Sequence, residues 1–428
     1  MTFLDEKRKF DSGSFLAAIL VGIMFSADRN LLLTHYVIGK QNVSMLTIGT
    51  ILFIGGFYIF RVIQQSRLNI PTGKKRLVFC SLLLASYFLF HELFFGDLLV
   101  SAKYSIFLGI ICLYILSNYK FFYVYKVLGY VGGLISGIII FQQILLLVFA
   151  GGDPSQFEIS IPGSDYNRWL SCDFVTPFGL GMFEVCSGPG SISIFGISYH
   201  RSLFFTTEPK YISSILLVTF GSLLVSKSKS VLKYVCLLAH LFAFALIASA
   251  AAILVVIVSF LMLYSRYTGA FIYCALVFLA PMFLLPIIFE LLLQLAGVEG
   301  YLLGRIYSGA TSIGVGGVAD WSLLGESLGS CADIACRRSR GLLGNLYGTY
   351  GVLGFFIFWL FLFYVISPVF EMVKSKKFQK KNDANFGLLI LVNTYVVFNL
   401  YFFGDLFNMF GLFIISSLIF LPKYMSGI

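Results

Sequence analysis

Residues 231–264 read VLKYVCLLAHLFAFALIASAAAILVVIVSFLMLY, a stretch that is apolar almost throughout. A helix that crosses a membrane needs about 20 apolar residues, so this stretch is too long for one comfortable crossing. Ser249 lies near its middle, and we expect a tight helical hairpin with spans at 233–248 and 250–265. This choice decides the topology, because a single span here would move every later loop to the opposite side of the membrane.

The rest of the chain continues this pattern. It has 428 residues, is 59% hydrophobic and carries only 12% charged residues, whereas a soluble domain has about twice that charged fraction. No cleavable signal peptide is evident, so the apolar run from Ser14 is predicted to be a retained first span. We predict an all-α polytopic membrane protein with about 12 transmembrane helices, in which residues 1–428 form a single integral membrane domain. The predicted spans are 14–32, 43–62, 77–95, 101–118, 128–150, 208–226, 233–248, 250–265, 270–295, 344–369, 385–403 and 405–422.

Loop charge orients these spans. With the N-terminus inside, the inner segments hold 20 of the 30 lysine and arginine residues, so the positive-inside rule predicts that both termini are cytoplasmic. Reading 231–264 as one span would place the lysine cluster at 374–381 outside, which the same rule disfavours. The net charge of +10 is therefore attributed to lysine-rich inner loops rather than to nucleic-acid binding.

Two long segments remain outside, at 151–207 and 296–343, and only these are large enough to carry a soluble site. Their basic residues are mainly arginines, whose planar guanidinium forks can bind phosphate through two hydrogen bonds. Any one of them could instead solubilise its loop or pair with an acidic neighbour. As a set they favour anion binding: Arg168, Arg201, Arg305, Arg337, Arg338 and Arg340.

The outer cysteines also occur in pairs. Cys172 and Cys186 share the first outer segment, and Cys331 and Cys336 share the second, which fits an oxidising compartment and makes them disulfide candidates. Neither segment has clustered histidines at zinc-ligand spacing, so no metal site is predicted. The chain also lacks a Walker loop and a dinucleotide fingerprint, and no cofactor is predicted.

The first outer segment ends at Tyr199–Pro209 and enters the next span. Thr207 can cap that helix, with Glu208 and Pro209 in its first positions. Because carboxylates favour helix N-termini, Glu208 has a purely structural interpretation. Its position at the outer membrane boundary, near Arg201, also makes it a candidate general base or a partner that orients the arginine.

The second outer segment has two comparable features. Arg305 precedes a glycine-rich stretch that ends at Gly317, and Arg337 and Arg338 lie just before the span that opens at Gly344-Asn345. Basic residues at the outer end of a span can simply anchor it to lipid head groups. The same position would hold a lipid-linked pyrophosphate.

The order of these features resembles the O-antigen polymerase and ligase superfamily. The resemblance rests on Arg201 followed by Glu208-Pro209 at the start of a span, the Ser-containing hairpin, the glycine-rich second outer segment, and Asn345 followed by Tyr350-Gly351 and Gly354. Arg-x10-Gly spacings are a feature of the Wzy-type polymerases, and they occur here at Arg168–Gly179, Arg305–Gly316 and Arg337–Gly348. Ligases of the family typically carry a histidine just before the asparagine. Gly344 stands there in this chain, which favours the polymerase.

The resemblance implies a glycosyltransferase of the bacterial inner membrane that joins undecaprenyl-pyrophosphate-linked oligosaccharide units at the periplasmic face, in lipopolysaccharide biosynthesis. Its expected partners are that lipid-linked substrate, membrane lipid and a chain-length regulator protein. Glu208, Arg201 and Arg305 are the catalytic candidates, and the pyrophosphate-binding candidates are Arg168, Arg201, Arg305, Arg337 and Arg338. The alternatives are an O-antigen ligase, a flippase for lipid-linked oligosaccharide and, more distantly, a peptidoglycan-type glycosyltransferase.

Overall fold

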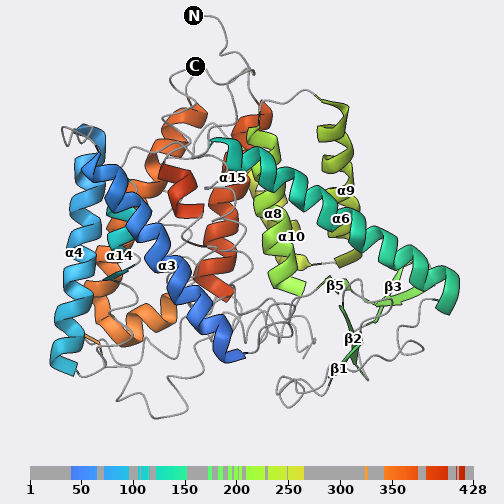
Figure 1. Cartoon of the computed structure of the whole chain (residues 1–428), viewed down its shortest axis with the longest axis horizontal. Helices are drawn as coiled ribbons and strands as arrows, with labels where there is room; N and C mark the ends of the chain where they lie inside the picture. Colours follow the sequence, from blue (N-terminus) through green and yellow to red (C-terminus); the bar gives the residue numbers. More distant parts are fainter. Residues whose placement is uncertain are drawn as a thin grey trace, which may run out of the picture. The chain divides into compact units, whose positions relative to one another are not determined.

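The computed structural model describes helices and short strands between residues 40 and 419 (Figure 1). The described residues are 40–64, 72–95, 105–106, 108–113, 115, 122–151, 172–175, 182–186, 191–194, 197–200, 202–204, 209–226, 230–247, 249–264, 323–325, 342–374, 382–402, 411 and 414–419. The predicted spans at 14–32 and 270–295 lie outside these residues.

Helices form where apolar spans were predicted. Their bounds are α3 Lys40–Ile63, α4 Thr72–Phe95, α6 Phe122–Ala150, α8 Pro209–Val225, α9 Val231–Ile247, α10 Ala250–Tyr264, α14 Leu342–Lys374, α15 Asn382–Thr394 and the π-helix η5 Tyr395–Phe402. Two of them contain stretches long and apolar enough to cross a membrane, Tyr125–Phe149 and Tyr350–Lys374. The helical prediction is confirmed for these segments, and the structure adds five short strands in the first outer segment.

The long apolar stretch at 231–264 is broken at Ser249, as predicted. The Ala252 amide lies 3.4 Å from the Ser249 hydroxyl oxygen, and the Ile253 amide donates to the Ser249 carbonyl at 3.1 Å. Ser249 therefore occupies the capping position that serine favours, where it accepts from a backbone amide in the first turn of α10. The stretch forms two helices of 17 and 15 residues instead of one long helix.

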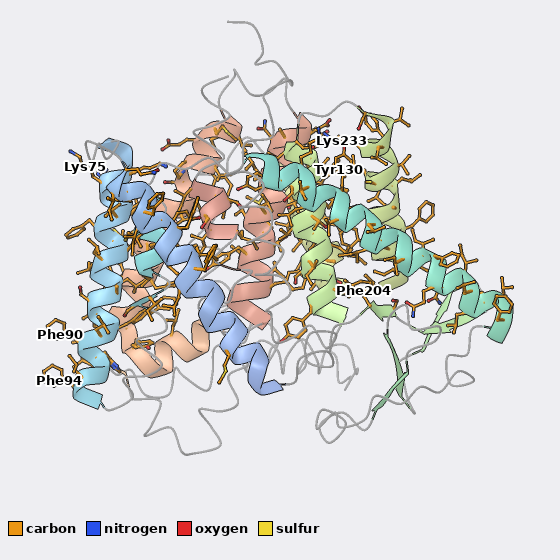
Figure 2. All side chains as sticks on the ribbon, viewed as in Figure 1. Lys75, Phe90, Phe94, Tyr130, Phe204 and Lys233 are labelled. Carbon is orange, nitrogen blue, oxygen red and sulfur yellow. The ribbon has the colours of Figure 1, made fainter. Side chains whose placement is uncertain are left out.

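The helices expose apolar side chains and bury polar ones. On α4, Phe90 and Phe94 are 62% and 81% exposed and point outward (Figure 2), whereas Ser81 and His91 are buried. In a protein surrounded by water the polar side chains would be the exposed ones. Broad apolar faces of this kind mark surfaces that contact membrane or a partner, and this distribution favours lipid around the described helices.

The described helices belong to two compact units, one formed by residues 1–50, 121–260 and 383–391 and the other by residues 51–120, 261–382 and 392–428. In the first unit, α6 packs against both α8 and α9. Glycines on α6 make this approach possible, because a Cβ at Gly132 would overlap Thr219 on α8 and one at Gly133 would crowd Cys236 on α9. Small residues at helix contacts are typical of membrane bundles, where close packing replaces the hydrophobic effect.

A buried pair of polar side chains lies at this same crossing. The Thr219 hydroxyl oxygen and His240 Nε2 are 3.0 Å apart, and His240 Nδ1 is 2.6 Å from the Cys236 carbonyl oxygen. Because a carbonyl only accepts, Nδ1 carries the hydrogen that binds Cys236. The Thr219 hydroxyl also lies 3.0 Å from the Leu216 carbonyl oxygen, so its one hydrogen is shared between that carbonyl and His240 Nε2. The pair joins α8 to α9 across the face that α6 covers.

Lys233 joins the end of α8 to the first turn of α9, away from this crossing (Figure 2). Its Nζ donates to the Ser226 carbonyl at 2.6 Å, just beyond the last residue of α8. Exposed carbonyls at a helix C-terminus favour a nearby cation, so this lysine stabilises the end of α8. Lys233 thus has a structural role besides the orienting charge that the sequence predicts for it.

Gly132→Ala is expected to destabilise the protein. In most helix interiors this change is favourable by about 1 kcal/mol, but here the added methyl would overlap Thr219 and displace its hydrogen bond, and overpacking costs about 1–3 kcal/mol. The midpoint of thermal unfolding in detergent should therefore fall. Gly137→Ala on the same helix is the matched control, since its Cβ would meet no atom within 4 Å. Equal midpoints for the two variants would contradict the packing described here.

Candidate functional site

The first outer segment contains a small antiparallel sheet. Strands β1 Cys172–Val175, β2 Met182–Cys186 and β5 Ser202–Phe204 pair in the order β1-β2-β5, and β3 Ser191–Ile194 pairs with β4 Ile197–His200. The strands are short but rich in β-branched and aromatic residues, which favour a pleated backbone. Sequence reasoning missed them because alternation over three to five residues gives almost no periodic signal.

Strand β5 connects this sheet to the helices of the first unit. It contacts α6, α8 and α9 (Figure 1), and Ser202 is fully buried. Phe204 has a φ of +54°, a left-handed conformation that is uncommon for a bulky side chain. Only residues 205–208 then separate β5 from the start of α8 at Pro209. The end of the first outer segment is therefore held within a few residues of a helix terminus.

The predicted catalytic residues of this segment flank the described elements. Arg201 lies in the chain between β4 and β5, and Glu208 directly precedes Pro209, the first residue of α8. Both residues lie outside the described part of the chain. The structure therefore positions the elements on either side of them, and their side-chain roles stay predictions.

The other predicted site residues also fall outside the described residues, except for the pair Cys172 and Cys186. Arg168, Arg305, Arg337, Arg338, Cys331 and Cys336 all lie in stretches that the structure does not describe. Cys172 and Cys186 lie in β1 and β2, where the strand register places them directly opposite each other. Opposed residues in antiparallel strands have Cα atoms about 4.5–5.5 Å apart, within the range of about 4.4–6.8 Å that disulfides span. The register is therefore compatible with a bond between them.

The second outer segment meets α14 at a break in that helix. Gly351 has φ 65° and ψ −170°, a conformation that essentially only glycine adopts. At this point the Leu353 amide donates to the carbonyl of Leu323, a residue of the second outer segment, at 3.2 Å. A Cβ at Gly351 would overlap the backbone of residues 323–325. Glycine is required here both for the backbone conformation and for the close approach.

Two polar side chains of α4 complete this contact. His91 Nε2 donates to the Leu324 carbonyl at 2.7 Å, and the Tyr87 hydroxyl donates to the Tyr350 carbonyl at 2.7 Å. The His91 ring also meets the Tyr350 ring edge-on, with centroids 5.0 Å apart. Sequence reasoning missed both side chains because they lie inside an apolar span. The available signal was a histidine within a membrane helix, which by itself suggests a specific role.

The described residues give no indication of a metal centre. Among them, no group of three or more His, Cys, Asp or Glu side chains could hold a metal ion. Glu208, Cys331 and Cys336 lie outside the described residues. The expectation that no metal is needed therefore stays a prediction.

Comparison with known proteins identifies no relative. The chain matches no protein-family model, no curated protein and no solved structure. The resemblance to the O-antigen polymerases therefore rests on the motifs in the sequence and on their order along the chain.

A disulfide between Cys172 and Cys186 is expected in the protein isolated from membranes without reductant. Peptide mapping by mass spectrometry should recover the two residues as one linked peptide that separates on reduction. Closing a loop of roughly 15 residues stabilises a fold by about 3 kcal/mol in the chain-entropy model, so Cys172→Ser should loosen the sheet.

Cys236→Ser is the control, because Cys236 is a free thiol on α9 and its loss should leave the linked peptide intact. Recovery of Cys172 and Cys186 as separate unmodified thiols from unreduced membranes would show that the predicted pairing is wrong.

Proposed function

We propose that this protein is an O-antigen polymerase. It would join undecaprenyl-pyrophosphate-linked oligosaccharide units at the periplasmic face of the bacterial inner membrane, with about 12 spans and both termini in the cytoplasm. The observation that carries the proposal is the end of the first outer segment. Strand β5 contacts α8, and only residues 205–208 separate the two elements in the chain. Arg201 directly precedes β5, and Glu208 directly precedes α8.

The proposed reaction needs little from the protein besides charge and position. The bond between the anomeric carbon of the growing chain and its pyrophosphate oxygen breaks, and a hydroxyl of the incoming unit forms the new glycosidic bond. The hydroxyl proton passes to Glu208, and undecaprenyl pyrophosphate leaves with the bonding electrons. Negative charge therefore develops on the pyrophosphate during the step, where Arg201 and Arg305 would bind it.

Arginine suits this role better than lysine. Catalysis requires contacts that are stronger in the transition state than in the ground state, and fixed donors aimed at developing charge provide them. A guanidinium offers two parallel donors in a rigid plane, while an ammonium offers a hydrated point charge on a flexible stem. The predicted outer segments carry arginine and the predicted inner loops carry mostly lysine. This distribution agrees with phosphate binding outside and with charge-based orientation inside.

Two other functions fit parts of the same pattern. An O-antigen ligase would use the same lipid-linked donor, but Gly344 stands where ligases of the superfamily typically carry histidine. A flippase would be expected to show repeated halves and charged or interrupted helices near the membrane centre. The two halves of this chain do not resemble each other, and the charged residues are concentrated in the loops.

Replacing Arg201 or Arg305 by alanine should shorten the polysaccharide. Loss of one donor to developing charge typically lowers the rate of the chemical step by about 100- to 1,000-fold, which would collapse the ladder of chain lengths to single repeat units. Lysine at either position should restore activity poorly if the contact is bidentate. The ladder would be read on gels of extracted lipopolysaccharide, with protein levels checked by immunoblot.

Lys377→Ala is the control for general loss of positive charge, because Lys377 lies in the lysine cluster that the charge rule places inside and in neither outer segment. Wild-type ladders in both Arg201→Ala and Arg305→Ala, at normal protein levels, would refute the pyrophosphate role.

The purified protein, given only a lipid-linked repeat unit, should make longer lipid-linked products. No nucleotide or added acceptor is required, because one unit donates to the hydroxyl of the next. The products would be separated by chain length and counted by mass spectrometry. Transfer only after addition of lipid A-core would identify a ligase. Failure of both reactions, together with movement of labelled substrate across proteoliposome membranes, would identify a transporter.

A further inference from the structure

The break in α14 leaves backbone groups that its own helix does not pair. In an unbroken helix the Tyr350 carbonyl would accept from the Gly354 amide four residues later. The Tyr87 hydroxyl instead donates to that carbonyl at 2.7 Å and also forms a hydrogen bond with the Gly354 backbone. One hydroxyl on α4 therefore bridges the interrupted helical bond. A Cβ at Gly354 would lie 2.8 Å from the Tyr87 ring, so glycine at this position makes room for the bridge.

The same break binds the second outer segment through its backbone. The Leu323 carbonyl accepts from the Leu353 amide of α14, and the next carbonyl, that of Leu324, accepts from His91 of α4. Consecutive carbonyls thus bind two different helices. The side chains of Leu323 and Leu324 are 66% and 44% exposed, so apolar burial contributes little to holding them. Hydrogen bonds therefore fasten this segment.

His91 is well suited to be the fastening group. It lies one helical turn after Tyr87, so both side chains project from the same face of α4. It is 4% exposed, and its ring is fixed against the rings of Tyr87 and Tyr350, at centroid distances of 6.0 and 5.0 Å. Because a carbonyl only accepts, Nε2 must carry the hydrogen that binds Leu324. A buried donor with a fixed direction provides a defined attachment point.

We propose that His91 is a positioning residue that fastens the backbone of Leu323–Gly325, in the second outer segment, into the break of α14 at Gly351. The attachment has a consequence for the chain that follows. Residues 326–341 join Gly325 to Leu342, the first residue of α14, so both ends of this stretch are held at the same helix. A chain fixed at both ends samples fewer conformations than one fixed at a single end.

This stretch carries Arg337 and Arg338. If the proposed function holds, fastening the start of this stretch would lower the entropy cost of binding the pyrophosphate there. This consequence for activity rests on the proposed function. The anchor itself does not, because its hydrogen bonds can be followed without any substrate.

The anchor is tested by hydrogen exchange on the full-length protein in lipid nanodiscs. The readout is the Leu353 amide, which is protected when the Leu323 carbonyl is bound to it. His91→Leu removes the donor while keeping an apolar side chain, and exchange in the peptide containing Leu353 should accelerate about tenfold, the effect of losing one hydrogen bond. His91→Gln keeps an N–H donor at a similar reach and should restore protection. Leu83→Gln on the exposed face of α4 is the control for a new amide in this helix.

Unchanged protection in His91→Leu would overturn the proposal, as would equal acceleration in His91→Leu and His91→Gln. The activity readout is kept separate. If the wild-type protein polymerises, His91→Leu should raise KM more than it lowers kcat, and His91→Gln should be close to wild type. If the wild-type protein does not polymerise, the proposed function fails, while the exchange result still decides whether the anchor exists.

Discussion

Hydrocarbon offers no partner to a hydrogen-bonding group, so a chain within a membrane must satisfy its polar groups internally. The break in α14 shows how this constraint shapes the fold. The interrupted bond between Tyr350 and Gly354 is bridged by Tyr87 from another helix, and the Leu353 amide finds the carbonyl of Leu323. A local break in one helix therefore requires a second helix and an outer segment at fixed positions. At His240 on α9 the same requirement pairs a buried ring with the backbone of its own helix and with a hydroxyl of α8.

Much of the helical framework could be predicted because it depends on local properties of the chain. Apolar length gave the helices, and Ser249 broke the longest apolar stretch because a serine hydroxyl can cap the helix that follows it. The break at Gly351 could not be predicted in the same way. It depends on contacts with residues 323–325 and with α4, far away in the sequence. Glycine at 351 and 354 was visible as a motif, but its physical reason needed those partners.

The candidate site was predictable only as a location along the chain. Charge and spacing selected the two outer segments, and the structure adds short strands in the first one, of which β5 contacts helices of the first unit. That sheet had no usable signal in the sequence, since each strand is too short to show its period. The opposition of Cys172 and Cys186 depends on strand register, which the spacing of two cysteines does not determine. The residues of the candidate site could therefore be selected from the sequence, whereas their positions in space depend on pairing between distant segments.

The start of α8 bears on the roles predicted for Glu208. A helix N-terminus carries partial positive charge and stabilises an adjacent carboxylate in its ionised form. Glu208 directly precedes Pro209, the first residue of α8, so if the proposed function holds its carboxylate would be favoured in the ionised form. The ionised form is the one that can accept the proton of an attacking hydroxyl, and it is also the one that can pair with Arg201. The helix terminus therefore supports both roles that the sequence predicts for Glu208.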